Sequence, residues 1–173
     1  MDYVSGGAGS NDIRATAGGT MLAGNAGSDV LRGGKGDDIL IGGAGDDALY
    51  GGAGGDQFRF FGNQIEGASD TDRLYDLNFA DGDTLVFGAF GGLFEDAAGV
   101  NAFNNGDAAI ISSWDGLANA FEAAGARATY SGNAALDLLF ITFDNGAGQT
   151  QTLRISNGYS AFVSALDGGP VPV

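Results

Sequence analysis

Large apolar residues recur at every ninth position through the first third of the chain. The period does not slip over residues 6–59, and the residues on it are Ile13, Leu22, Leu31, Leu40, Leu49 and Phe58. Glycine keeps the same period four residues ahead of them, at Gly9, Gly18, Gly27, Gly36, Gly45 and Gly54. This regularity indicates a stack of short repeats rather than a flexible linker, because a glycine-rich linker has no need of an apolar residue at a fixed spacing.

Each nine-residue unit is typical of a glycine turn followed by a short strand. Glycine allows the tight turn, and the apolar side chain of the strand points inward. One unit cannot bury that side chain alone, whereas stacked units form a continuous apolar ladder. Two units then make one coil of a flattened parallel roll, with loops on both edges. We expect about three coils, and the period adds Val4 to the start of the ladder.

The sixth position of the units is polar and mostly acidic. The period places Asn11, Asp29 and Asp47 on one edge of the roll, and on the other edge Asp2, Thr20, Asp38 and Asp56. Stacked carboxylates repel one another unless a cation lies between them. A hard dication takes about 6 to 8 oxygen ligands, which paired Asp side chains and loop carbonyls supply. We expect several Ca²⁺ ions, since soft ligands are absent and Mg²⁺ requires a stricter octahedron.

The predicted ligands are sixth-position side chains and fourth-position glycines, namely Asp29, Asp38, Asp47, Asp56, Asn11, Gly27, Gly36, Gly45, Gly54 and Gly9. The pairs Asp29 with Asp47 and Asp38 with Asp56 supply two carboxylates each and are expected to be the best sites. Asn11 with Asp29 is expected to be weaker, since an amide brings no charge. Pairs through Thr20 are expected to be weakest or empty.

The units resemble the glycine-rich nonapeptides G-G-x-G-x-D-x-U-x of the RTX proteins, where U is a large apolar residue. Units 33–41 (GGKGDDILI), 42–50 (GGAGDDALY) and 51–59 match at every specified position. Earlier units depart from the pattern at Asn11, Asn25 and, most strongly, at Ala15, Thr16 and Thr20. The resemblance implies a right-handed parallel β-roll with calcium in its loops. The chain also begins inside a repeat, which suggests a fragment of something longer.

Residues 60–88 resemble the cap that follows RTX repeats in serralysin-type proteases and in the R-modules of mannuronan epimerases. Their apolar residues are expected to extend and close the ladder, and these are Leu74, Leu77, Phe79, Leu85 and Phe87. Asp70, Asp72 and Asp76 form either a solvated acidic surface or one further calcium site.

Residues 89–173 carry an α+β pattern. A helix is predicted from an N-cap at Ser112 or Ser113 to Gly125. The helical spacing of Trp114 favours a core residue over an aromatic platform for sugar binding. Strands are predicted over 136–143 and 150–155, and a last helix over 159–166. The fold class is therefore mainly β: a roll over 1–59, capping strands over 60–88, and an α+β segment over 89–173 that packs on the end of the roll or forms a subdomain beside it.

Composition excludes several classes of function. The chain has 22 acids, 7 bases and a net charge of -15, which disfavours nucleic acid as a partner. Histidine and cysteine are absent, so Ser-His triads, thiol nucleophiles and the usual zinc ligands are excluded. The carboxylates Glu66, Glu95 and Glu122 share no motif, and Lys35 is expected to be solvated. We therefore expect no enzyme in this segment and no transmembrane span.

Two classes of function fit these observations. In the first, the chain is the calcium-binding C-terminal domain of a larger secreted Gram-negative protein, folding outside the cell. The resemblance implies a type I secretion apparatus as partner, with a signal in residues 89–173, although the ending GGPVPV departs from serralysin-type signals. In the second, the roll is a calcium-dependent scaffold for a module that binds polysaccharide, a cell surface or another protein. We expect a monomer in either case.

Overall fold

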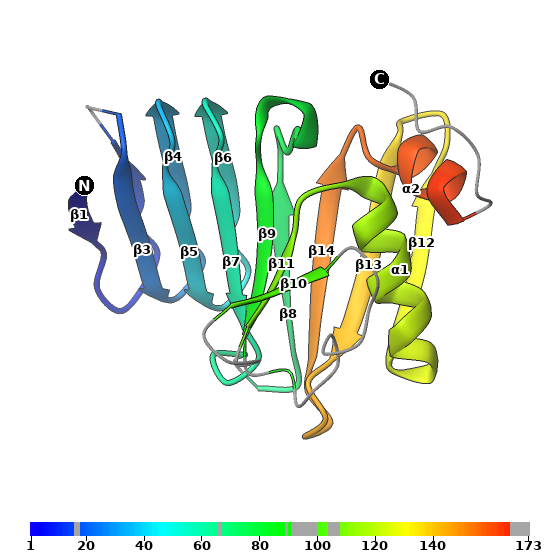
Figure 1. Cartoon of the computed structure of the whole chain (residues 1–173). Helices are drawn as coiled ribbons and strands as arrows, with labels where there is room; N and C mark the ends of the chain where they lie inside the picture. Colours follow the sequence, from blue (N-terminus) through cyan, green and yellow to red (C-terminus); the bar gives the residue numbers. More distant parts are fainter. Residues whose placement is uncertain (16–17, 66, 89, 91–99, 104–107, 167–173) are drawn as a thin grey trace.

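Successive repeats form alternate strands of two facing sheets. The computed structural model describes residues 1–15, 18–65, 67–88, 90, 100–103 and 108–166. The roll strands of the first sheet are β1 (Asp2–Ser5), β3 (Thr20–Ala26), β5 (Ile39–Ala44), β7 (Gln57–Phe61) and β9 (Thr84–Gly88). Those of the second sheet are β2 (Asp12–Arg14), β4 (Val30–Lys35), β6 (Ala48–Ala53) and β8 (Ser69–Leu74). All of these neighbours pair in parallel (Figure 1), as the sequence predicted.

The strand register confirms that two repeats make one coil. Leu22 lies opposite Leu40 in the first sheet, and Leu31 lies opposite Leu49 in the second. The ladder residues from Ile13 to Phe58 are buried between the sheets. Val4 is the exception: it lies in register with Leu22 but is 39 % exposed, because β1 is the outermost strand of its sheet. The prediction that Val4 is a buried ladder residue is therefore wrong.

The glycines of the repeat serve two different purposes. In the units from residue 33 to 59, those at the second and fourth positions adopt positive φ, as at Gly43 (+110°) and Gly45 (+112°), a conformation that costs other residues free energy. The first-position glycine instead provides space. A Cβ on Gly33 would lie 2.5 Å from the carbonyl oxygen of Gly51 and 2.7 Å from Oδ2 of Asp38.

The expected cap continues both sheets of the roll. Strand β8 pairs with β6, and β9 pairs with β7, both in parallel. The side chains of Leu74, Leu77, Leu85 and Phe87 are buried, as predicted. Phe79 begins the short 3-10 helix η1 (Phe79–Asp81) and is half-buried, with its ring edge-on to Trp114 at a centroid distance of 5.0 Å.

The same two sheets run on into the C-terminal part. Strand β14 (Thr150–Ser156) adds in parallel to β8, followed by antiparallel β13 (Leu138–Asp144) and β12 (Ala128–Asn133). In the first sheet β11 (Ala108–Ile111) adds antiparallel to β9, followed by β10 (Val100–Phe103). The C-terminal part therefore extends the roll and is not a subdomain beside it.

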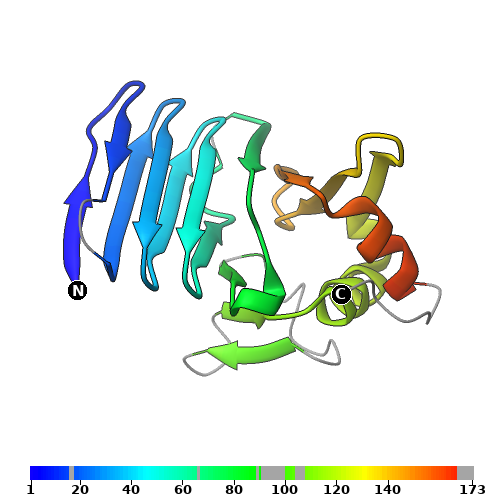
Figure 2. The ribbon, with the colours of Figure 1, turned by 90° about the horizontal axis from the view of Figure 1, so that it is seen from above.

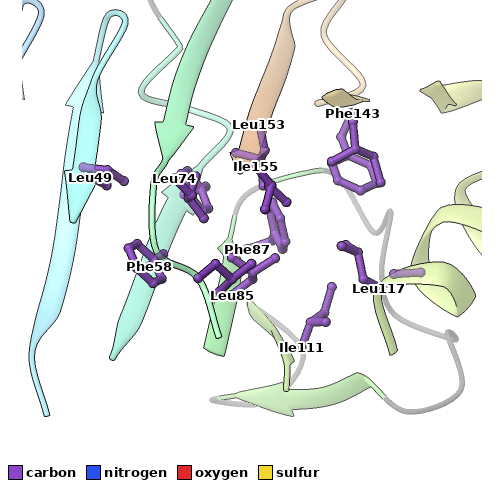
Figure 3. Close-up of a cluster of buried hydrophobic side chains, with 14 of the residues drawn as sticks. Leu49, Phe58, Leu74, Leu85, Phe87, Ile111, Leu117, Phe143, Leu153 and Ile155 are labelled. Atoms are coloured by element: carbon purple, nitrogen blue, oxygen red, sulfur yellow. The ribbon is translucent and has the colours of Figure 1, made fainter. Parts of the chain in front are cut away.

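Two helices fill the space where the sheets diverge (Figure 2). They are α1 (Trp114–Ala124) and α2 (Tyr159–Leu166), and η2 (Gly125–Arg127) follows α1. Both helices and the strands β13 and β14 lie where the sequence predicted them, while β10, β11 and β12 were not predicted. Ser113 caps α1 by accepting a hydrogen bond from the Gly116 amide at 3.0 Å. Leu117 of α1 reaches the same core as Leu49, Leu85 and Phe143 (Figure 3), and Trp114 packs half-buried against that core.

Candidate calcium sites along the edges of the roll

The sixth-position side chains form two hydrogen-bonded series, one on each edge of the roll. On the first edge, the backbone N–H groups of Asn11, Asp29 and Asp47 donate to Oδ1 of the next residue in the series at 2.7, 2.8 and 2.9 Å, and the members of that series are Asn11, Asp29, Asp47 and Asp72. On the second edge, the corresponding distances are 2.6, 2.8 and 2.8 Å, and the members are Thr20, Asp38, Asp56 and Asp83. Each carboxylate therefore fixes the coil before it through one oxygen.

The second oxygen of the middle carboxylates has no such partner. In the described part of the chain, Oδ2 is buried without a hydrogen bond in four residues: Asp29, Asp38, Asp47 and Asp56. A buried charged oxygen without a partner is strongly unfavourable. The regular placement of these four atoms indicates a place for cations along both edges.

Backbone carbonyls lie beside these oxygens. The space above Gly33 is bounded by Oδ2 of Asp38 and by the carbonyl of Gly51, one coil further on. The space above Gly24 is bounded in the same way by Oδ2 of Asp29 and the carbonyl of Gly42. A Cβ would fill each space, which explains the first-position glycine. Carboxylate and carbonyl oxygens are the donors that Ca²⁺ prefers, so this set of residues fits the ion.

The fourth-position glycines stack closely from coil to coil. A Cβ on Gly54 would lie 2.5 Å from the carbonyl oxygen of Gly36, and one on Gly45 would lie 2.6 Å from that of Gly27. A Cβ on Gly27 would lie 2.9 Å from the carbonyl oxygen of Gly9. These carbonyls thus belong to the same loops as the acidic series, and their role as ligands stays a prediction. Within the described ranges no three acidic side chains gather at one point.

Burial changes the acidity of the series. It raises the pKa of Asp47 to about 7 and that of Asp56 to about 6, from 3.8. It also raises the pKa of Asp29 and Asp83, and that of Asp72 well above the usual value. The charged form is disfavoured because burial removes water from the carboxylates. An ion bound at Oδ2 would reverse that effect.

The structure does not bring Asp70, Asp72 and Asp76 together as one further site. Asp70 and Asp72 accept hydrogen bonds from the amides of Gly45 and Asp47, before β6 begins. Asp76 accepts from Gly51 and Gly52, at the far end of that strand. Asp72 instead continues the first edge.

Sequence reasoning missed Asp83, which continues the second edge. A signal was present, because the segments Asp72-Arg73-Leu74 and Asp83-Thr84-Leu85 repeat the acid-x-apolar order of positions six to eight. The spacing hid it: Asp72 follows Asp47 by 25 residues and Asp83 follows Asp56 by 27, in place of 18.

Comparison with known families bears on the same segment. The model of the RTX calcium-binding nonapeptide repeat matches residues 23–58 in four copies. These residues are RTX repeats. The family binds calcium, and it is typical of secreted Gram-negative proteins. A search of curated proteins finds no match.

The matched segment contains all four residues with an unpartnered Oδ2. The divergent units with Asn11 and Thr20, and the continuing residues Asp72 and Asp83, lie outside it. Among the residues that the structure describes, no helix has both the length and the apolar character needed to cross a membrane. Glu66, Glu95, Thr16 and the ending GGPVPV lie outside the described residues.

Proposed function

We propose that this chain is a calcium-triggered folding segment of a secreted bacterial protein, and a binding and folding element rather than an enzyme. The four buried Oδ2 atoms without a partner carry the proposal. Without cations, these atoms and the raised pKa values of Asp47 and Asp56 oppose folding. With cations, the same atoms become ligands that hold neighbouring coils together.

The energetics support a switch between cell interior and exterior. Glycine loses more backbone entropy on folding than other residues, and the repeats are rich in it. An extracellular-type calcium site has a Kd of about 10⁻⁴ M. At about millimolar calcium, each such site contributes roughly 1–2 kcal/mol to the folded state, while at submicromolar calcium it contributes almost nothing. Several sites together are enough to decide whether a marginal domain folds.

Circular dichroism of residues 1–173 tests this proposal. We expect little β signal in EGTA and a full β signal at millimolar calcium, with Mg²⁺ at the same concentration as the control. Trp114, the single tryptophan, gives a second readout from the C-terminal core through its fluorescence. A fully formed β signal in EGTA would rule out the switch.

Export through a type I apparatus is the second part of the proposal. An unfolded chain can pass a narrow exporter, and folding outside then makes the passage directional. Fusion of residues 100–173 to a passenger protein tests where the signal lies. Secretion of the passenger only from cells with a type I exporter supports the proposal, and retention in those cells contradicts it.

A second candidate function is binding of an acidic polysaccharide on the outer face of the second sheet. Four of the six arginines lie on this face: Arg14, Arg32, Arg73 and Arg154. Arg14 and Arg32 are paired across strands and both contact Asp12. Arg73 and Arg154 are also directly paired, and no acidic side chain of the described residues bridges them. Like charges side by side are unfavourable. A polymer that carries carboxylates would neutralise this pair of arginines and so reduce their repulsion.

Retention on immobilised polygalacturonate in calcium tests this candidate. Arg73→Gln together with Arg154→Gln should reduce binding at low salt by at least tenfold. Lys35→Gln, which removes a single exposed charge at the end of β4, should change it less than twofold. Equal binding by all three proteins would reject this surface.

A further inference from the structure

The last carboxylate of each edge differs from those before it. In Asp72 and Asp83 both oxygens accept hydrogen bonds, whereas in Asp29, Asp38, Asp47 and Asp56 only Oδ1 does. On Asp83, the backbone N–H of Asn78 donates to Oδ2 at 2.8 Å. On Asp72, the side-chain amide of Gln151 donates to Oδ2 at 3.1 Å. The atom that is unpartnered within the series is thus satisfied at its end.

Gln151 is well placed for this role. It lies in β14, points inward with Leu153 and Ile155, and is 2 % exposed. A neutral amide so deeply buried needs a partner, and its Nε2 finds one in Asp72. In the strand register, β14 places Leu153 opposite Asp72, where another carboxylate would continue the series. The edge therefore changes at this point from a row of acids to an apolar row.

We propose that Gln151 takes the place of a cation at Asp72, so that the calcium sites of the first edge end at Asp47. This inference rests on calcium binding by the repeats. Asp72 then serves as a hydrogen-bond acceptor that joins the last calcium-binding coil to the C-terminal strands. Through Gln151, a residue 79 positions away in the chain, β14 is aligned with the edge of the roll without an ion. Asn78 has the same role at Asp83 on the second edge.

Counting bound calcium by equilibrium dialysis of the full chain tests the proposal. Asp72→Asn keeps an oxygen for the Asp47 amide, and its own amide can pair with Gln151 in the flipped orientation. We expect this variant to bind as many ions as the unmodified protein. Asp47→Asn should bind at least one ion fewer. Loss of an ion in Asp72→Asn would overturn the proposal, whereas absence of bound calcium in the unmodified protein would instead overturn the function on which it rests.

Replacement of the amide by an acid gives the converse test. Gln151→Glu puts a second carboxylate against Oδ2 of Asp72, and we expect one additional ion per chain. The matched control is Gln57→Glu, which makes the same change beside Arg59 on β7 and should leave the ion count unchanged. A Gln151→Glu protein with unaltered Trp114 fluorescence and no additional ion would contradict the proposal. If this variant does not fold, the Asp72→Asn count decides.

Discussion

The backbone N–H of Asp29 donates to Oδ1 of Asp47 at 2.8 Å, one full coil away. Asp47 therefore acts on two coils at once, holding the preceding loop through Oδ1 and presenting Oδ2 to the place where a cation fits. Repetition of this arrangement along both edges makes the loops structurally dependent on one another. A change in one carboxylate is expected to affect both its own coil and the coil before it.

This dependence predicts that Asp47 contributes more to calcium binding than Thr20 does. Asp47→Ala removes the acceptor for the Asp29 amide and the unpartnered Oδ2 together. We expect it to lose at least one calcium ion and to raise the calcium concentration at the folding midpoint several-fold. Thr20→Ala removes neither, because Thr20 enters its series through its backbone N–H. Calcium titration followed by circular dichroism compares the two; an equal loss of calcium in both would refute this order.

A charge in the apolar ladder should prevent folding. Leu40 is fully buried between Leu22 and Phe58 of neighbouring strands. Leu40→Asp loses the buried apolar surface and places a carboxylate where no described donor faces it, at a cost of more than about 3 kcal/mol. Ile41→Asp is the control, since Ile41 is only half-buried and lies opposite Arg59. Circular dichroism at saturating calcium should show a folded control and an unfolded Leu40→Asp protein.

A single methyl group should discriminate the first-position glycine from an ordinary loop glycine. Gly33→Ala would put a Cβ 2.5 Å from the Gly51 carbonyl and 2.7 Å from Oδ2 of Asp38. We expect destabilisation by about 1–3 kcal/mol and weaker calcium binding. Gly7→Ala has no atom within 4 Å of the new methyl group and should change stability by less than about 0.5 kcal/mol. Urea unfolding in calcium measures the stability of both variants. Similar unfolding midpoints would contradict the claim that position 33 has no room for a Cβ.

The acidity of the edges predicts opposite pH trends with and without calcium. Burial raises the pKa of Asp47 to about 7 and of Asp56 to about 6. A raised pKa in the fold means that protonation stabilises the calcium-free roll. This stabilisation is complete below pH 4 or so and is lost as the pH rises through about 7. In EGTA, any residual structure should therefore melt at a lower temperature at pH 8 than at pH 5.

Calcium binding should follow the reverse trend, because the ion needs the deprotonated carboxylates. At pH 6 a proton competes with the ion at Asp47 in the folded roll, so chains that are already folded should bind calcium more weakly than at pH 8. Competition with a calcium chelator measures the affinity of the folded protein at both pH values. An affinity that does not change with pH would contradict ligation by Asp47 and Asp56.

The sequence by itself determined the repetitive part of this protein. A period of nine specifies the strands, the parallel register and the inward ladder. Each unit contacts only its neighbours, and the units share the same order of glycine, polar and apolar positions. For the same reason, the sequence alone was enough to place Asp29 with Asp47 on one edge of the roll and Asp38 with Asp56 on the other. The capped helix α1 and the hairpin of β13 and β14 are also local patterns, so they too were predictable.

Only the tertiary structure decided where that repetition ends. Asp72 and Asp83 follow insertions of unequal length, which removes them from the period. Their closing partners, Gln151 and Asn78, have no spacing that could reveal them. The same holds for Val4, whose exposure depends on its being at the edge of a sheet. Contacts between coils repeat with the sequence, whereas contacts that end a stack join segments with no common period, and these exist only once the chain is folded.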